Sequence, residues 1–182
     1  MKIRPLAIEG AFEVTPVRHG DSRGTFLEWY RFDVLAAAVG HPLDLAQANL
    51  STSARDVVRG IHFADVPPGQ AKYVTCVSGA ILDVIVDLRP ESPTFLNKAD
   101  FTLTGDSQRS LYVPAGCAHG FQALTDPADV SYRIDRAHDP REDVSIAFDD
   151  PGLAIEWPLP VTLMSERDKA APSLAEATRR LT

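Results

Sequence analysis

The sequence predicts an all-β protein, a barrel or sandwich of the jelly-roll type with short helices at its periphery. Two observations carry this prediction. Short runs of β-forming residues recur at close and regular spacing, and turns containing glycine and proline separate them. Helical patterns are confined to Phe32–Val39, which ends at Gly40, and to a long C-terminal helix expected over Ser165–Leu181.

Extended segments occupy the first part of the chain. Strands are expected over three of them: Ile3–Ile8, Ala11–Val17 and Thr25–Tyr30. Leu45–Ser53 is polar and also extended. Because side chains alternate along a strand, Gln47 and Asn49 are expected on one face of it.

Two runs of β-formers, Tyr73–Val77 and Ile81–Leu88, form the centre of the sequence. Gly79 lies between them and is free to adopt a positive φ, so we expect the two runs to pair as a β-hairpin. Alternation along the second run places Asp83 among apolar neighbours, where a carboxylate requires a partner. Asp87, near the end of the strand, is interpreted as a surface charge.

The second half continues the pattern of short strands. They are expected over four segments: Phe95–Leu103, Ser110–Val113, Gln122–Leu124 and Val130–Ile134. His119 precedes the third of these and is therefore expected at a strand entrance.

Length and composition indicate one soluble globular domain over residues 1–182, with 45% hydrophobic and 24% charged residues. The net charge of −7 argues against a general nucleic-acid binder. No apolar run is long enough to span a membrane, and the first residues lack the apolar core of a signal peptide. Cys76 lies mid-strand as an expected buried filler, and two cysteines make no disulfide framework, so we expect a reducing cytoplasm.

Three groups suited to an anionic ligand, Arg59, His62 and Lys72, surround a Pro-Pro-Gly loop. From spacing alone, His62 is either a catalytic or ligand-contacting residue or a hydrogen-bonded structural histidine. Lys72 enters an apolar strand and points either to solvent or to a ligand. The pattern indicates a site, and its chemistry stays open at this level.

Other site classes find little support. A metal site on a β-barrel commonly has a His-x-His pair, but Ala64 follows two residues after His62 and His119 has no such partner either. No cysteine or serine lies in a recognisable nucleophile setting, and no glycine-rich phosphate loop occurs. A bound phosphate would be held by side chains such as Arg23 and Arg59.

Seven motifs give the chain a family resemblance. They are DSRGTFLEWYR (21–31), QANLSTS (47–53), VVRGIHF (57–63), PPGQAKYVTCVSGAILDVIVDLRPESPTF (67–95), LYVPAGCAHGFQAL (111–124), and DDPGLAIEWPL with LMSERD (149–159 and 163–168). In their order and spacing the chain resembles the dTDP-4-dehydrorhamnose 3,5-epimerase family, including the mono-epimerases of antibiotic deoxysugar pathways. The resemblance implies a cupin-like jelly-roll barrel, a homodimer, and catalysis without metal or other cofactor.

The resemblance also implies a substrate and roles for individual residues. The substrate would be a dTDP-4-keto-6-deoxyhexose, which loses protons at C3″ or C5″, α to the C4″ ketone. His62 would be the base, Asp168 would orient it, Lys72 would stabilise the enolate, and Tyr132 would return a proton from the opposite face. Arg23 and Arg59 would meet the diphosphate. The remaining positions would shape the pocket or support it: Phe26, Glu28, Gln47, Asn49, Asp83, His119 and His138.

The sequence departs from the family pattern at two places. Ala137 and His138 stand where the family has a pair of aromatics, one of which helps to hold the nucleotide base or sugar, and Ala64 stands where many members have glutamine. Two other functions stay open beside epimerisation: a 3,4-ketoisomerase of the same substrate, and a non-catalytic sugar-nucleotide-binding protein.

Overall fold

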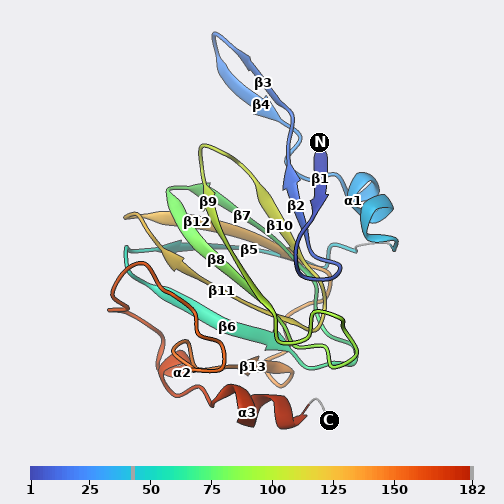
Figure 1. Cartoon of the computed structure of the whole chain (residues 1–182). Coiled ribbons are helices and arrows are strands. Elements are labelled where there is room, and N and C mark those ends of the chain that lie inside the picture. Colours follow the sequence, from blue (N-terminus) through green and yellow to red (C-terminus); the bar gives the residue numbers. More distant parts are fainter. Residues whose placement is uncertain (42–43, 181–182) are drawn as a thin grey trace.

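The computed structural model describes residues 1–41 and 44–180, and most of its regular structure lies in two antiparallel β-sheets (Figure 1). Within these residues, one sheet has six strands in the order β1 (Lys2–Pro5), β2 (Phe12–Thr15), β10 (Ser110–Val113), β7 (Lys72–Ser78), β12 (Ala128–Ile134) and β5 (Gln47–Ser53). The other has five in the order β13 (Asp143–Ser145), β6 (Val58–Ala64), β11 (Cys117–Ala123), β8 (Ala80–Asp87) and β9 (Lys98–Thr104).

The main core lies between these sheets. Val74 and Cys76 of β7 point inward from the six-stranded sheet and meet Ile81, Ile85 and Phe121 of the five-stranded sheet. Cys76 is fully buried, as predicted. Burial of this apolar surface drives the association of the two layers. The prediction of an all-β jelly roll is confirmed.

Peripheral segments cover the outer faces of both sheets. The helix α1 (Phe32–Val39) has the predicted bounds and ends at Gly40, whose φ of 88° suits a glycine; Leu35 packs against Tyr73 and Tyr112 on the six-stranded sheet. On the five-stranded sheet, Phe63 and Val86 pack against the C-terminal part of the chain.

The predicted pairing of the central hairpin is wrong. The strands β7 and β8 form close to the predicted bounds, but β7 pairs with β10 and β12 whereas β8 pairs with β11 and β9. Gly79, with a φ of 74°, turns the chain from one sheet into the other, and a Cβ there would collide with Thr125 and with the carbonyl oxygen of Pro127. The positive φ predicted for Gly79 is confirmed, but local sequence does not specify the partner strand.

The predicted C-terminal helix over Ser165–Leu181 is also wrong as one continuous element. The structure has α2 (Glu166–Lys169), α3 (Leu174–Ala177) and the short 3-10 helix η1 (Thr178–Arg180), and Leu181 lies outside the described residues. Pro172 lies between α2 and α3. It has no N–H to donate and disfavours helical conformation at the residue before it, which interrupts the helix.

A two-stranded hairpin, β3 (Arg18–Asp21) with β4 (Gly24–Leu27), projects from the body of the molecule (Figure 1). The predicted strand Thr25–Tyr30 is therefore shorter and belongs to this hairpin. Arg23, at its tip, donates backbone and side-chain hydrogen bonds to Asp21. Phe26 is 68% exposed.

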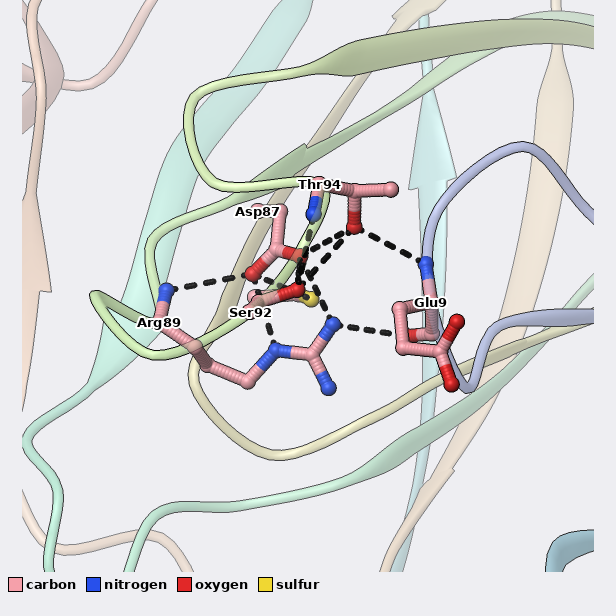
Figure 2. Close-up of polar contacts among 6 residues, drawn as sticks. Glu9, Asp87, Arg89, Ser92 and Thr94 are labelled. Carbon is pink, nitrogen blue, oxygen red and sulfur yellow. Dashed lines mark hydrogen bonds and ion pairs between the residues drawn. The ribbon is translucent and has the colours of Figure 1, made fainter.

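The interpretation of Asp87 as a surface charge is wrong, because its side chain is fully buried. Its carboxylate accepts hydrogen bonds from Arg89, from Ser92 at 2.5 Å and from Thr94 at 2.6 Å (Figure 2). Arg89 also donates to the backbone oxygen of Glu9, which joins the N-terminal loop to this cluster. The loop wraps around the carboxylate, so β9 begins at Lys98 rather than at the predicted residue 95.

Candidate active site

A cavity of about 220 Å³ lies where the two sheets and α2 meet. Both sheets and the α2 segment contribute its lining, which consists of Arg59, His62, Lys72, His119, Phe121, Tyr132, Ser165, Arg167 and Asp168. A larger hollow of about 530 Å³ lies beyond Arg167, between β13 and the C-terminal helices, but its described lining contains no histidine, lysine or tyrosine. We therefore take the smaller cavity as the candidate active site.

His62 and Asp168 form a close pair in this cavity. The Nε2 atom of His62 lies 2.6 Å from Oδ1 of Asp168, and only 5% of the Asp168 side chain is exposed. Burial raises the pKa of Asp168, but hydrogen bonds from His62, Ser165 and the backbone of Gly60 outweigh it and hold the pKa below its ordinary value. The ionised carboxylate fixes the orientation of the ring, which suits His62 to work as a base.

Lys72 enters the cavity from β7. Its Nζ atom donates a hydrogen bond of 3.2 Å to the backbone oxygen of His62. Desolvation lowers the pKa of Lys72 to about 8, although the carboxylates of Asp143 and Asp83 favour its charged form. A cation therefore lies in the same cavity as the imidazole at neutral pH.

Tyr132 lines the cavity from the six-stranded sheet, whereas His62 belongs to the five-stranded sheet. Tyr132 is paired with Val74 of β7 and Asn49 of β5. The phenol and the imidazole thus come from opposite layers of the molecule. A molecule bound between them would have one group on each side.

A second histidine–carboxylate pair lies deeper. His119 is inside β11, opposite His62 in the register, so the expected position at a strand entrance is wrong. Its Nε2 atom lies 2.8 Å from Oδ2 of Asp83, which is fully buried on β8 as its strand face predicted. Because Nε2 is engaged, only Nδ1 of His119 is left for a ligand.

Of the predicted binding residues, Arg59 and His119 line the cavity, whereas Gln47, Asn49 and His138 do not. Arg59 lines it and donates to Ser53 at 3.0 Å. Gln47 donates to the Oδ1 atom of Asn49 at 2.8 Å, and its own oxygen accepts from the backbone N–H of His138 at 3.0 Å. This chain of bonds uses both amide oxygens as acceptors and leaves N–H groups of Asn49 to donate.

The structure does not bring all the predicted residues together. Arg23 and Phe26 belong to the projecting hairpin, and Glu28 forms an exposed ion pair with Arg31. None of the described residues of this hairpin lines the cavity that contains His62.

Sequence reasoning missed three lining residues: Phe121, Ser165 and Arg167. Phe121 lies two positions after His119 on the same strand face, so alternation was the available signal. Ser165 and Arg167 lie in the SERD motif next to Asp168. Arg167 forms an ion pair of 2.5 Å with Asp143, a contact between distant segments that local sequence does not reveal.

The arrangement is suited to moving a proton on a bound molecule. Deprotonation of a carbon next to a ketone requires a base, here oriented by a carboxylate, and a cation to stabilise the enolate. Reprotonation requires an acid, and a phenol lies on the opposite wall of the cavity. Among the described residues, no three or more His, Cys, Asp or Glu side chains gather in a way that could hold a metal ion. No helix among them has the length and apolar character to span a bilayer.

Comparison with known proteins relates this site to a known chemistry. Residues 5–176 match the family model described as dTDP-4-dehydrorhamnose 3,5-epimerase. A dTDP-4-dehydrorhamnose 3-epimerase of Streptomyces niveus is 52% identical over 97% of this chain and 86% of its own length. A dTDP-4-dehydrorhamnose 3,5-epimerase of Mycobacterium tuberculosis is 46% identical over 97% of this chain and 89% of its own length.

Solved structures of epimerases are also similar to this chain. The crystal structure of a 4-keto-6-deoxy sugar epimerase from the novobiocin gene cluster of Streptomyces spheroides superposes with a TM-score of 0.94, at 52% identity, over 98% of this chain and 90% of the other. A 3′-monoepimerase from Streptomyces bikiniensis, solved in complex with dTDP-quinovose, gives a TM-score of 0.91 at 42% identity, over 97% and 89% of the two chains.

Proposed function

Because this chain belongs to the dTDP-4-dehydrorhamnose 3,5-epimerase family, we propose that it inverts C3″, C5″ or both in a dTDP-4-keto-6-deoxyhexose. The observation that carries the proposal is the placement of the His62–Asp168 pair and Tyr132 on opposite sides of one cavity. A base and an acid on opposite sides of a bound molecule are not needed for simple binding.

In the proposed reaction, His62 removes the proton from the carbon next to the ketone. The electron pair moves into the C4″ carbonyl and forms an enolate, and the Lys72 ammonium stabilises its oxygen. Asp168 stabilises the imidazolium that results. Tyr132 then donates its phenolic proton to the opposite face of the carbon, which inverts the centre. The imidazolium releases its proton to solvent and the phenolate takes one up, which restores both groups.

Hydrogen-bond donors in and around the cavity are proposed to bind the nucleotide. The guanidinium of Arg59 is suited to the diphosphate. Asn49, whose oxygen is occupied by Gln47, presents N–H groups to an acceptor such as a base carbonyl. His138 lies 46% exposed beside this pair and occupies the place of a family aromatic, so its ring is proposed to contact the base.

The exposed hairpin supports a homodimer. Arg23 and Phe26 lie outside the cavity of their own chain, yet their motif matches the family's binding residues. We propose that the hairpin completes the cavity of a second copy of this chain. Co-expression of Arg23→Ala with His62→Ala should then produce mixed dimers that recover activity. In each mixed dimer, one cavity has both an intact His62 and an intact Arg23 from the other copy. A monomer by light scattering, or no recovery in purified mixed dimers, would contradict this arrangement.

The test of the function is solvent exchange. The purified protein is incubated with dTDP-4-keto-6-deoxyglucose in D₂O while the ring protons are followed by NMR. Deuterium at C3″ and C5″ with inversion at both indicates the 3,5-epimerase, and inversion at one centre indicates a mono-epimerase. A carbonyl moved to C3″ indicates the ketoisomerase. No exchange at either carbon, with dTDP still bound, would leave a binding protein and reject the proposal.

A further inference from the structure

The position of Asp168 depends on a very short element. It lies in α2, which contains only Glu166–Lys169, a single turn. One turn of helix is unstable by itself, because the cost of ordering the backbone exceeds the gain from its first hydrogen bonds. Contacts outside the helix must therefore hold the carboxylate against His62.

Two contacts on the N-terminal side of α2 supply this support. The backbone N–H of Val58 donates to the oxygen of Leu163 at 3.2 Å, in a parallel bridge that starts at Val57. Ser165 then caps the helix: its hydroxyl accepts the backbone N–H of Asp168 at 3.1 Å. The segment is thus attached to β6 at Val58, and Ser165 sets where Asp168 lies relative to His62 on the same strand.

The Ser165 hydroxyl also favours the ionised form of the carboxylate. Although burial raises the pKa of Asp168, hydrogen bonds from the His62 ring, from Ser165 and from the Gly60 backbone lower it. Ser165 lines the cavity, so its side chain lies at the site rather than on the outer surface of the helix. A hydrogen bond to a charged group is stronger than one between neutral groups.

We propose that Ser165 is a positioning residue: its hydroxyl accepts the backbone N–H of Asp168 and so holds the carboxylate at the place where it orients the catalytic imidazole. This inference deepens the proposed function and rests on it. Ser165 performs no proton transfer on the substrate; it acts through Asp168.

The chain contains a matched control. Ser173 caps α3 by the same bond, with its hydroxyl accepting the N–H of Glu176 at 3.3 Å, and Glu176 reciprocates with a capping box. Ser173 does not line the cavity. Removal of this cap should destabilise the same C-terminal region without disturbing the carboxylate, so this variant separates positioning from general stability.

The experiment measures kcat and KM for Ser165→Ala, Ser165→Gly, Ser165→Thr and Ser173→Ala, each shown to be folded by circular dichroism. Glycine is nearly as good an N-cap as serine for helix stability but has no hydroxyl. We expect Ser165→Ala and Ser165→Gly to lower kcat about tenfold, because the carboxylate loses the hydrogen bond that holds its backbone in place, with KM changed less than twofold. Ser165→Thr should restore most of kcat, and Ser173→Ala should leave it unchanged.

Three results would overturn the inference: wild-type kcat in Ser165→Gly, an equal loss in Ser173→Ala, or a loss confined to KM. If Ser165→Ala does not fold, the glycine and threonine pair decides. Wild-type and Asp168→Asn proteins are assayed in parallel. No exchange by the wild type would reject the proposed function, whereas an active wild type with a slow Asp168→Asn and fast Ser165 variants would reject only the role of Ser165.

Discussion

The imidazole of His62 and the carboxylate of Asp168 meet with 2.6 Å between Nε2 and Oδ1, although 106 residues separate them in the chain. His62 is on β6 and Asp168 is on α2, which packs against that strand. The carboxylate is nearly inaccessible to solvent, so its charge acts on the ring with little screening.

Replacement of Asp168 by asparagine should lower kcat about 10- to 100-fold, because a charge-assisted hydrogen bond contributes about 1.5–3 kcal/mol. The ring loses its ionised partner while the volume of the side chain is preserved. Deuterium wash-in at the sugar carbons measures the rate of deprotonation directly. His62→Ala should abolish wash-in but leave dTDP binding intact. Turnover at the wild-type rate in either variant would remove this pair from the mechanism.

Tyr132→Phe should separate the two halves of the reaction. With His62 intact, the proton is still removed and deuterium returns from the same side, so exchange continues while inversion falls. One NMR time course reports both quantities. Inversion at the wild-type rate would show that another acid reprotonates the enolate.

Lys72 should limit the reaction on the alkaline side. Desolvation holds its pKa at about 8, below the ordinary value. The ammonium therefore loses its charge as the pH rises through about 8, and the enolate is then no longer stabilised by a cation. The kcat profile should therefore fall above that pH. Lys72→Arg should move this limb to higher pH, since arginine stays charged. Lys72→Ala should lower kcat more than it raises KM, and a change in KM alone would make Lys72 a binding residue.

Asp87 should stabilise the fold without taking part in the reaction. Burial raises its pKa, but hydrogen bonds from Arg89, Ser92 and Thr94 outweigh it and lower the pKa to about 2. Because the folded pKa lies below that of the unfolded chain, the carboxylate stabilises the fold above about pH 4, and this contribution is lost as the pH falls toward 2.

The pKa difference corresponds to about 2 kcal/mol, so Asp87→Asn should lower the free energy of unfolding at pH 7 by about that amount. Urea unfolding at pH 7 and at pH 3 measures the difference between variant and wild type, which should be smaller at the lower pH. An equal difference at both values would show that the charge of Asp87 is not the cause.

Local chemistry explains which parts of the fold the sequence predicted. Strand alternation and turn residues indicate where β7 and β8 begin and end, and Gly40 ends α1 where expected. The same signals are silent on partners. The pairing of β7 with β10 and β12 depends on packing against distant segments, and a glycine turn such as the one at Gly79 suits either a hairpin or a change of sheet. In contrast, the break in the expected C-terminal helix could have been predicted locally, because Pro172 lies within it.

For the site, the sequence by itself determined the chemical inventory: a histidine, a lysine and an aspartate in motifs that carry a family resemblance, and a tyrosine on an expected strand. Only the tertiary structure decided that His62 meets Asp168, that Asp83 is engaged by His119, and that Arg23 lies outside the cavity of its own chain. The physical reason is that side-chain type is encoded locally, whereas hydrogen bonding, burial and the resulting pKa shifts are set by residues that only folding brings within a few ångströms.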